Sequence, residues 1–168
     1  MIATRDDLVI TKWGARFSGL RFPCAIGRGG IGEKRGEGDS ITPRGVHRLQ
    51  YVITRPDRPV PTLPLPVVTS GPQDGWGDDP ADPAGYNRPI CRPYAASHER
   101  LRRADPLYDL VGVMDYNRDP ITPGGGSAIF LHVWRRPRYP TEGCIAFDPG
   151  DLLAILSRWT PRSRILIQ

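Results

Sequence analysis

Proline recurs from Pro23 to Pro161 and limits what this chain can fold into. The 168 residues include 19 prolines and 19 glycines, and this share of proline is about twice the usual one. A proline inside a helix removes a backbone hydrogen bond and clashes with the preceding turn, so the five prolines within Arg55–Pro66 exclude a helix there. Apolar residues still make up 39% and recur in strand-length runs, which disfavours disorder. We therefore expect a mainly β protein with many turns and long ordered loops.

The size of the chain favours one domain that spans residues 1–168. A chain of this length buries about 70% of the surface that its unfolded form exposes, so its core needs neither a metal nor a disulfide. Three cysteines, Cys24, Cys91 and Cys144, leave at least one free thiol. A disulfide between Cys24 and Cys91 is one alternative, but two buried free thiols are favoured.

Short runs of apolar and β-branched residues predict the strands. They are expected at Leu8–Trp13, Arg21–Ile26, Val46–Ile53, Tyr108–Asp115, Ala128–Trp134, Gly143–Phe147 and Arg164–Ile167. The run Ala128–Trp134 is the clearest buried strand among them. In the segments Gly27–Pro43 and Ser70–Pro93, apolar residues recur with neither the helical nor the strand period, so both segments are expected to be loops.

One good helix is expected near the C-terminus. Asp148 is a favoured N-cap residue and Pro149 follows at the first helical position, where proline is tolerated. The apolar residues of this segment, Leu152, Ile155, Leu156 and Trp159, recur at helical spacing, and Pro161 ends it. A second, short helix is expected at Ser97–Arg103.

The charge of the chain favours an anionic partner. A net charge of +5 suits nucleic acid, a membrane surface or a polymer rich in carboxylates. No apolar run approaches the roughly 20 residues that a membrane helix needs. The N-terminal sequence MIATRDDLVITKW lacks the apolar centre of a secretory signal, because Asp6 and Asp7 interrupt it. The chain is thus expected to remain inside the cell unless a signal was removed or is unconventional.

Two patterns suggest cofactors but do not have the context that such sites require. Gly27–Gly32 matches G-x-G-x-x-G, yet the residues that follow, EKRGEGDSITP, do not form the helix that would hold a pyrophosphate. The histidines His47, His98 and His132 do not pair with the cysteines at the short spacings of zinc sites. We expect no metal and no cofactor, a structural role for His47 and a solvated surface position for His98.

His132 and Cys144 together indicate nucleophilic catalysis. His132 lies in the buried strand AIFLHVW, and Cys144 opens the next strand 12 residues later, after a proline-rich loop. A strand, a loop and a returning strand can place two side chains next to each other, and Gly143 permits a close backbone approach to the sulfur. A free thiol is only a few per cent thiolate at neutral pH, and a neighbouring imidazole corrects this by taking its proton.

These residues also carry a resemblance to a known family. The segments GSAIFLHV, TEGCIAF and DLLAIL resemble the signature of the L,D-transpeptidase catalytic-domain family, in which a histidine on a strand precedes Ser/Thr-His-Gly-Cys. Upstream, GDSITPRG is similar to the family's Gly-Asp-x-x-Thr-Pro-x-Gly. The resemblance spans roughly Gly27 to the C-terminus and points to a short, single-domain branch.

The resemblance implies a β-sandwich with long loops and a C-terminal helix, and a groove that Cys144 and His132 face. It makes Cys144 the nucleophile and His132 the base, with backbone N–H groups around Gly143 and Cys144 in the oxyanion hole. It also implies a tyrosine hydroxyl at the site, which spacing assigns to Tyr116. The residues expected to bind the substrate's carboxylates are arginines: Arg88, Arg118, Arg135 and Arg136.

Two positions depart from the family's pattern. Glu142 replaces the usual histidine before Gly-Cys, and Ala146 replaces a frequent arginine two residues after the cysteine. A carboxylate beside Cys144 would raise the pKa of its thiol. We therefore expect Glu142 to point away from the sulfur, toward the incoming cationic amine.

The implied reaction is peptidoglycan crosslinking in the periplasm or cell wall, with a role in cell shape. Cys144 attacks a stem-peptide carbonyl to form a thioester, and an amine of a second stem resolves it to form 3-3 or 1-3 crosslinks. Carbapenems are the expected inhibitors. One alternative is a hydrolase or carboxypeptidase with the same dyad. A second is a basic, non-catalytic binding module, which the low aromatic content of 8% disfavours for nucleic acid.

Overall fold

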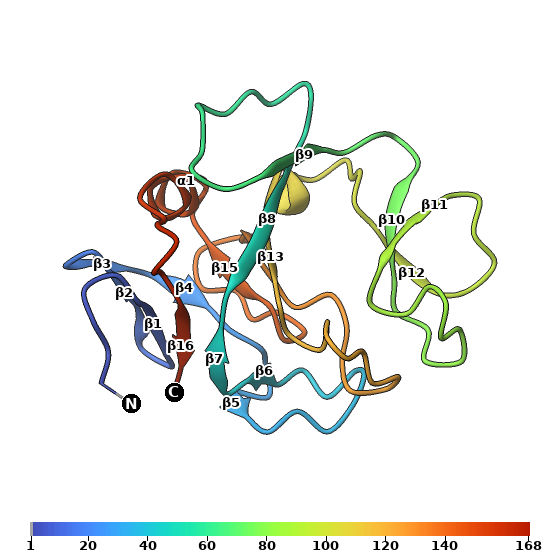
Figure 1. Ribbon diagram of the computed structural model, residues 1–168, viewed down its shortest axis with the longest axis horizontal. Coiled ribbons are helices and arrows are strands. Elements are labelled where there is room, and N and C mark those ends of the chain that lie inside the picture. Colours follow the sequence, from blue (N-terminus) through green and yellow to red (C-terminus); the bar gives the residue numbers. More distant parts are fainter. Residues whose placement is uncertain (1) are drawn as a thin grey trace.

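The computed structural model describes residues 2–168 and is mainly β, as the sequence predicts. A five-stranded sheet has the order β3-β2-β1-β16-β7 (Figure 1). Its strands are β1 (Leu8–Thr11), β2 (Gly14–Phe17), β3 (Leu20–Phe22), β7 (Gly45–His47) and β16 (Ile165–Ile167). Because β1 pairs in parallel with β16, the two ends of the chain lie side by side.

A six-stranded sheet of order β4-β15-β14-β13-β8-β9 forms the centre of the fold. Its strands are β4 (Cys24–Ala25), β8 (Leu49–Thr54), β9 (Val67–Thr69), β13 (Leu110–Met114), β14 (Phe130–Val133) and β15 (Ile145–Phe147). Strand β14 is antiparallel to β13 and parallel to β15.

The remaining strands form two smaller sheets. One has the order β11-β10-β12 and comprises β10 (Asp74–Gly77), β11 (Pro89–Cys91) and β12 (His98–Arg100). It stands apart from the other sheets in Figure 1. The other pairs β5 (Ile31–Gly32) with β6 (Thr42–Pro43) within the loop predicted at Gly27–Pro43.

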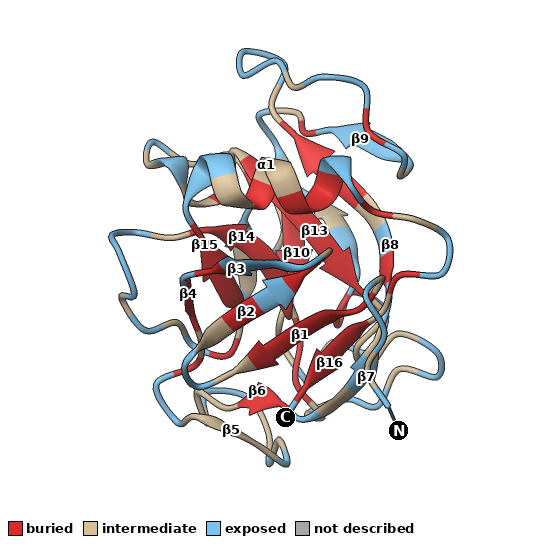
Figure 2. Cartoon of the chain, turned by 90° about the vertical axis from the view of Figure 1, so that its left-hand side faces the viewer, coloured by how far each residue is buried: buried red, intermediate tan, exposed pale blue. Residues whose placement is uncertain are grey.

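The main core lies between the two large sheets and helix α1 (Pro149–Ser157) (Figure 2). Asp148 caps this helix by accepting a hydrogen bond from the backbone N–H of Gly150 at 2.9 Å, as predicted. The predicted apolar face is buried, although Trp159 lies beyond the helix, which ends at Ser157. The two facing sheets give the sandwich-like arrangement with a C-terminal helix that the sequence implies.

A second apolar cluster lies on the other face of the central sheet. Since neighbouring side chains of a strand point to opposite faces, Leu131 and Val133 of β14 enter the main core, while Phe130 packs on the other side against Trp76 and Tyr108. The 3₁₀ turn η1 (Pro106–Tyr108) supplies Tyr108. This second face carries the candidate site.

Several sequence predictions were wrong in detail. Ser97–Arg103 is not a helix, because residues 98–100 form β12 and pair with β10. The predicted strand Arg21–Ile26 is interrupted at Pro23, and the predicted strand Val46–Ile53 at Arg48, so each becomes two strands in two different sheets. The predicted loop Ser70–Pro93 contains β10 and β11, and β2 was not predicted.

The cysteines are free, but they are not all buried. Cys24 is buried, Cys91 is exposed and Cys144 is half-buried. The prediction of a buried Cys91 was therefore wrong. Within residues 2–168 no helix has the length and apolarity required to cross a membrane, and no cluster of three or more His, Cys, Asp or Glu side chains is arranged to hold a metal ion.

Candidate active site

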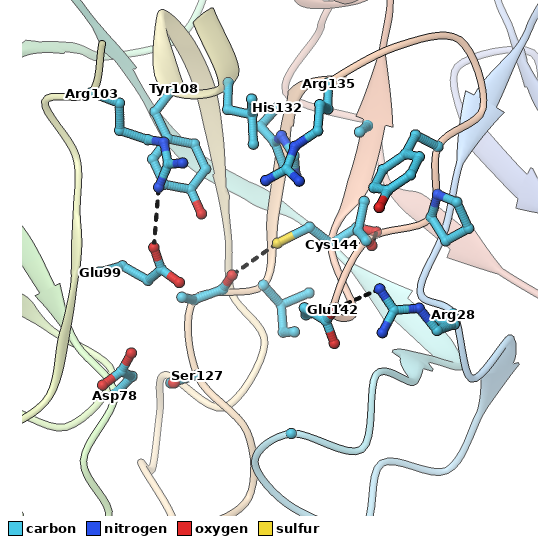
Figure 3. A pocket seen from close by; sticks show the side chains of 18 of the residues that line it. Arg28, Asp78, Glu99, Arg103, Tyr108, Ser127, His132, Arg135, Glu142 and Cys144 are labelled. Atoms are coloured by element: carbon cyan, nitrogen blue, oxygen red, sulfur yellow. Dashed lines mark hydrogen bonds and ion pairs between the residues drawn. The ribbon is translucent and has the colours of Figure 1, made fainter. Parts of the chain in front are cut away.

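His132 and Cys144 lie on the same face of the central sheet. Strand β14 pairs in parallel with β15, with His132 opposite Ala146. Cys144 directly precedes β15 and is therefore level with Phe130, whose side chain shares a face with that of His132. Both side chains line one cavity of about 350 Å³, which Figure 3 shows from close by.

The sulfur of Cys144 is held by two backbone groups. Its thiol donates a hydrogen bond to the carbonyl oxygen of Ala128 at 3.0 Å and accepts one from the N–H of Phe130 at 3.4 Å. Ala128 has a left-handed backbone with φ of 51°, which is uncommon for a residue other than glycine. Burial raises the pKa of the Cys144 thiol to about 12, so the resting residue is a neutral thiol.

The imidazole of His132 is fixed by its own strand. Its Nδ1 lies 2.8 Å from the carbonyl oxygen of Val133. Because a carbonyl only accepts, Nδ1 carries the proton of the neutral ring. Burial lowers the pKa of His132 to about 4. The ring also packs edge-on against Tyr108, with centroids 5.5 Å apart.

The turn before the cysteine is locked by Thr141 and Gly143. The hydroxyl of Thr141 donates to the carbonyl oxygen of Cys144 at 2.6 Å and accepts from the N–H of Gly143 at 3.2 Å. Gly143 has φ of 135°, and a Cβ atom there would lie 2.9 Å from the carbonyl oxygen of Ile41. Only glycine therefore fits this position without a backbone shift.

Charged side chains of both signs surround the sulfur. The cavity is lined by the arginines Arg28, Arg103 and Arg135 and by the acids Glu37, Asp78, Glu99 and Glu142. Glu142 lies on the rim, where its Oε1 pairs with Nη2 of Arg28 at 3.0 Å and its Oε2 accepts from the Ser40 hydroxyl. The charge of Glu142 is thus balanced by a neighbour.

Asp78 and Glu99 line the same cavity as the sulfur, on the side of the small three-stranded sheet (Figure 3). Glu99 lies in β12 opposite Trp76, and Asp78 follows β10. Burial, together with the neighbouring charge of Asp78, raises the pKa of Glu99. Oδ1 of Asp78 is buried and has no hydrogen-bond partner within residues 2–168. Sequence reasoning missed both acids, because the short segments around them carry no local signal for the pairing of β10 with β12.

A comparison with protein families shows what kind of domain carries this site. The family model of the L,D-transpeptidase catalytic domain, YkuD, matches residues 8–167. The chain belongs to this family. Searches of the curated proteins and of the solved structures found no match to this chain. Members of the YkuD family are acyltransferases of peptidoglycan stem peptides.

In this L,D-transpeptidase domain, Arg135 and Glu142 line the cavity, whereas three other predicted substrate-binding residues do not. The hydroxyl of Tyr116 donates to the carbonyl oxygen of Gly125 at 2.8 Å. The guanidinium of Arg118 stacks 4.8 Å above the ring of Trp76, and Arg88 is exposed. Arg136, also considered from the sequence, lies over the ring of Tyr139.

Proposed function

We propose that this domain is a peptidoglycan L,D-transpeptidase in which Cys144 is the nucleophile and His132 is the base. The observation that supports this most is that a half-buried thiol and a neutral imidazole line the same cavity from neighbouring segments of the central sheet. The family match supplies the class of reaction.

The proposed reaction starts from two neutral groups. Because the thiol pKa is about 12 and the imidazole pKa about 4, the proton moves from Sγ to Nε2 as the sulfur attacks a stem-peptide carbonyl, rather than before. The C–N bond then breaks, His132 returns the proton to the leaving amine, and a thioester to Cys144 remains. The backbone around Gly143 and Cys144 is the proposed oxyanion site.

An amine of a second stem then attacks the thioester, which forms the crosslink and restores the thiol. This amine is an ammonium in solution, so an anionic side of the cavity attracts it. Asp78 and Glu99 are proposed to provide that side. Glu99 forms only a long ion pair, with 3.9 Å between its Oε2 and Nη1 of Arg103, and Asp78 forms no ion pair within residues 2–168. The arginines Arg28 and Arg135 are proposed to hold the carboxylates of the stems.

The position of the cleaved bond in the donor stem peptide sets the type of crosslink. Cleavage after the third residue of this peptide gives 3-3 links, and cleavage after its first residue gives 1-3 links. Such a reaction takes place in the periplasm or cell wall.

The first test is acylation of the sulfur. Intact-mass measurement after mixing with a carbapenem is expected to show one covalent adduct on the wild type and none on Cys144→Ala. His132→Gln is expected to acylate about 10²–10⁴-fold more slowly. An adduct that persists on Cys144→Ala would place the nucleophile elsewhere.

The second test separates transfer from hydrolysis. With a stem-peptide donor and a labelled amine, a transpeptidase gives the labelled amide, and chromatography with mass detection measures it. Release of the free acid alone, with the amine in excess, would instead support a carboxypeptidase with the same two residues.

A further inference from the structure

A buried lysine lies in the long loop between β5 and β6 (Figure 1). The side chain of Lys34 is only 2% exposed, and its Nζ pairs with Oδ1 of Asp39 at 2.6 Å. Removal of an ammonium from water is costly even when the charge is paired. Lys34 is also one of two lysines among the 23 lysine and arginine residues of the chain. A buried lysine at this position therefore calls for a reason.

The stem of Lys34 passes beside Gly126. A Cβ atom at Gly126 would lie 2.3 Å from Cε and 2.6 Å from Cδ of Lys34, so no larger residue fits there while the lysine keeps its place. A guanidinium is planar and broader than an ammonium, so this narrow passage accommodates lysine and not arginine. Gly126 lies two residues before Ala128, whose carbonyl oxygen accepts the hydrogen bond of the Cys144 thiol.

The ammonium of Lys34 ends behind the turn that carries Cys144. Nζ lies 3.6 Å from the position that a Cβ atom of Gly143 would occupy. Lys34 does not line the cavity, so it approaches this turn from within the protein, whereas Glu142 and Cys144 lie on the cavity side in Figure 3. One buried positive charge thus contacts both backbone segments that hold the sulfur.

Asp39 does not cancel this charge completely. Its carboxylate also accepts hydrogen bonds from the backbone N–H groups of Arg35 at 2.6 Å and Ile41 at 2.9 Å, which share its negative charge. The three heavy atoms nearest to the Cβ position of Gly143 include Nζ of Lys34 but no atom of Asp39. The ion pair is therefore a dipole whose positive end faces the turn.

The charge of Lys34 opposes the effect of burial on the sulfur. Burial raises the pKa of the Cys144 thiol most, and the ammonium of Lys34 acts in the opposite direction. Since burial prevails, the resting thiol stays neutral. The ammonium then has its effect during the reaction, as negative charge develops.

We propose that Lys34 is a positioning residue whose buried ammonium, behind the turn at Gly143, stabilises the negative charge that develops on the sulfur and on the attacked carbonyl oxygen. A fixed charge in a site without water needs no reorganisation during the reaction. Although Asp39 offsets it in part, a charge at this short range is expected to change the reactivity of the sulfur by about tenfold. The role rests on the proposed function, in which Cys144 is the nucleophile.

The test measures the reactivity of the sulfur in a folded protein. Lys34→Met keeps the length of the stem, and its combination with Asp39→Asn removes both charges of the pair together. In a Cys91→Ser background, iodoacetamide alkylates Cys144, and mass spectrometry of the peptide that contains it gives the rate. Lys34→Met/Asp39→Asn is expected to be alkylated about tenfold more slowly at a fixed pH, while thermal unfolding shows that it is folded.

Acylation by a carbapenem is expected to show the same loss in a particular form. The maximal rate should fall about tenfold, and the carbapenem concentration that gives half of this rate should not change, because Lys34 does not line the cavity. The control Asp6→Asn/Arg162→Gln removes one charge of each sign from an exposed ion pair and is expected to react at the wild-type rate.

Asp39→Asn alone gives a prediction of opposite sign. It keeps the ammonium and removes the counter-charge, so alkylation of Cys144 is expected to be at least as fast as in the wild type. A pair that only maintains the structure would instead make this variant slower, and that result would overturn the proposal. This comparison decides the question if Lys34→Met/Asp39→Asn does not fold.

Wild-type alkylation by the folded Lys34→Met/Asp39→Asn variant would also overturn the proposal. The proposed function is judged separately, because iodoacetamide reports on the sulfur and not on its reaction with a peptide. A sulfur that is alkylated as expected but forms no carbapenem adduct would support the role of Lys34 and contradict the transpeptidase.

Discussion

At the scale of single residues, burial sets the protonation of the proposed dyad. The same removal from water raises the pKa of Cys144 and lowers that of His132, so both groups are neutral at pH 7. A preformed thiolate–imidazolium pair would need charged neighbours that stabilise it. The carboxylate of Glu99 instead raises the thiol pKa further. The sequence placed the two residues, but their protonation follows from the packing around them.

His132 is expected to make stability depend on pH. The pKa of His132 is about 4 in the folded protein and 6.5 in the unfolded chain. Between these two pH values, only the unfolded chain takes up the proton. Stability is therefore complete above pH 6.5 and falls by about 3 kcal/mol as the pH drops toward 4. Urea unfolding at several pH values measures this for the wild type and for His132→Phe, which lacks this contribution. Parallel pH profiles of the two proteins would contradict the assignment.

Glu99 is expected to contribute more than Glu142 to binding of the amine acceptor. In Glu99→Gln, KM for the amine acceptor should rise about tenfold, as expected for loss of a hydrogen bond to a charged group. Acylation by a carbapenem should not slow, since the charge that raises the thiol pKa is gone. Glu142→Gln is the comparison, because the carboxylate of Glu142 is already paired with Arg28. A larger effect of Glu142→Gln would support the sequence prediction that this residue guides the amine.

At the scale of elements, the turn into β15 decides where the sulfur lies. Thr141 and Gly143 hold the chain just before Cys144, and β15 then pairs with β14. The sulfur is thereby fixed relative to the strand that carries His132. A local change in this turn would move the sulfur without touching either proposed catalytic side chain.

Gly143→Ala is expected to lower stability by about 2–4 kcal/mol, because it combines a strained φ with overpacking against a backbone carbonyl. Gly124→Ala is the control, since Gly124 also has positive φ, of 79°, but a Cβ atom there meets nothing within 4 Å. The control should lose only about 1 kcal/mol. Thermal unfolding with calorimetry checks both, and equal losses would show that the contact with Ile41 does not matter.

At the scale of the whole molecule, the two ends of the chain hold the five-stranded sheet together. Asp7 is 2% exposed and accepts two hydrogen bonds, each of 2.8 Å, from Nε and Nη2 of Arg164. These residues precede β1 and β16, the parallel strands at the centre of that sheet. The hydrogen bond from Arg164 holds the pKa of Asp7 well below its usual range, so this stabilisation is present above the ordinary carboxyl pKa and is lost in strong acid.

Asp7→Asn is expected to lower the free energy of unfolding by about 1–3 kcal/mol, because it removes a charged partner from a buried pair of hydrogen bonds. Asp6→Asn is the matched control. Asp6 forms an ion pair with the exposed Arg162 in the same region of the molecule, and water screens that pair. Urea unfolding at pH 7 should therefore show a much smaller loss for Asp6→Asn, and equal losses would contradict a special role for the buried pair.

Local signals in the sequence determined the helix Pro149–Ser157, the strand that carries His132, and the choice of His132 and Cys144 as the proposed pair. Each depends on capping, spacing or apolar runs within a few residues, which act on the chain before it folds. The tertiary structure alone decided that Asp78 and Glu99 line the cavity of the sulfur and that Tyr116 does not. These outcomes depend on which strands pair across long stretches of chain, as β10 does with β12, and short segments such as His98–Arg100 carry no signal for a distant partner.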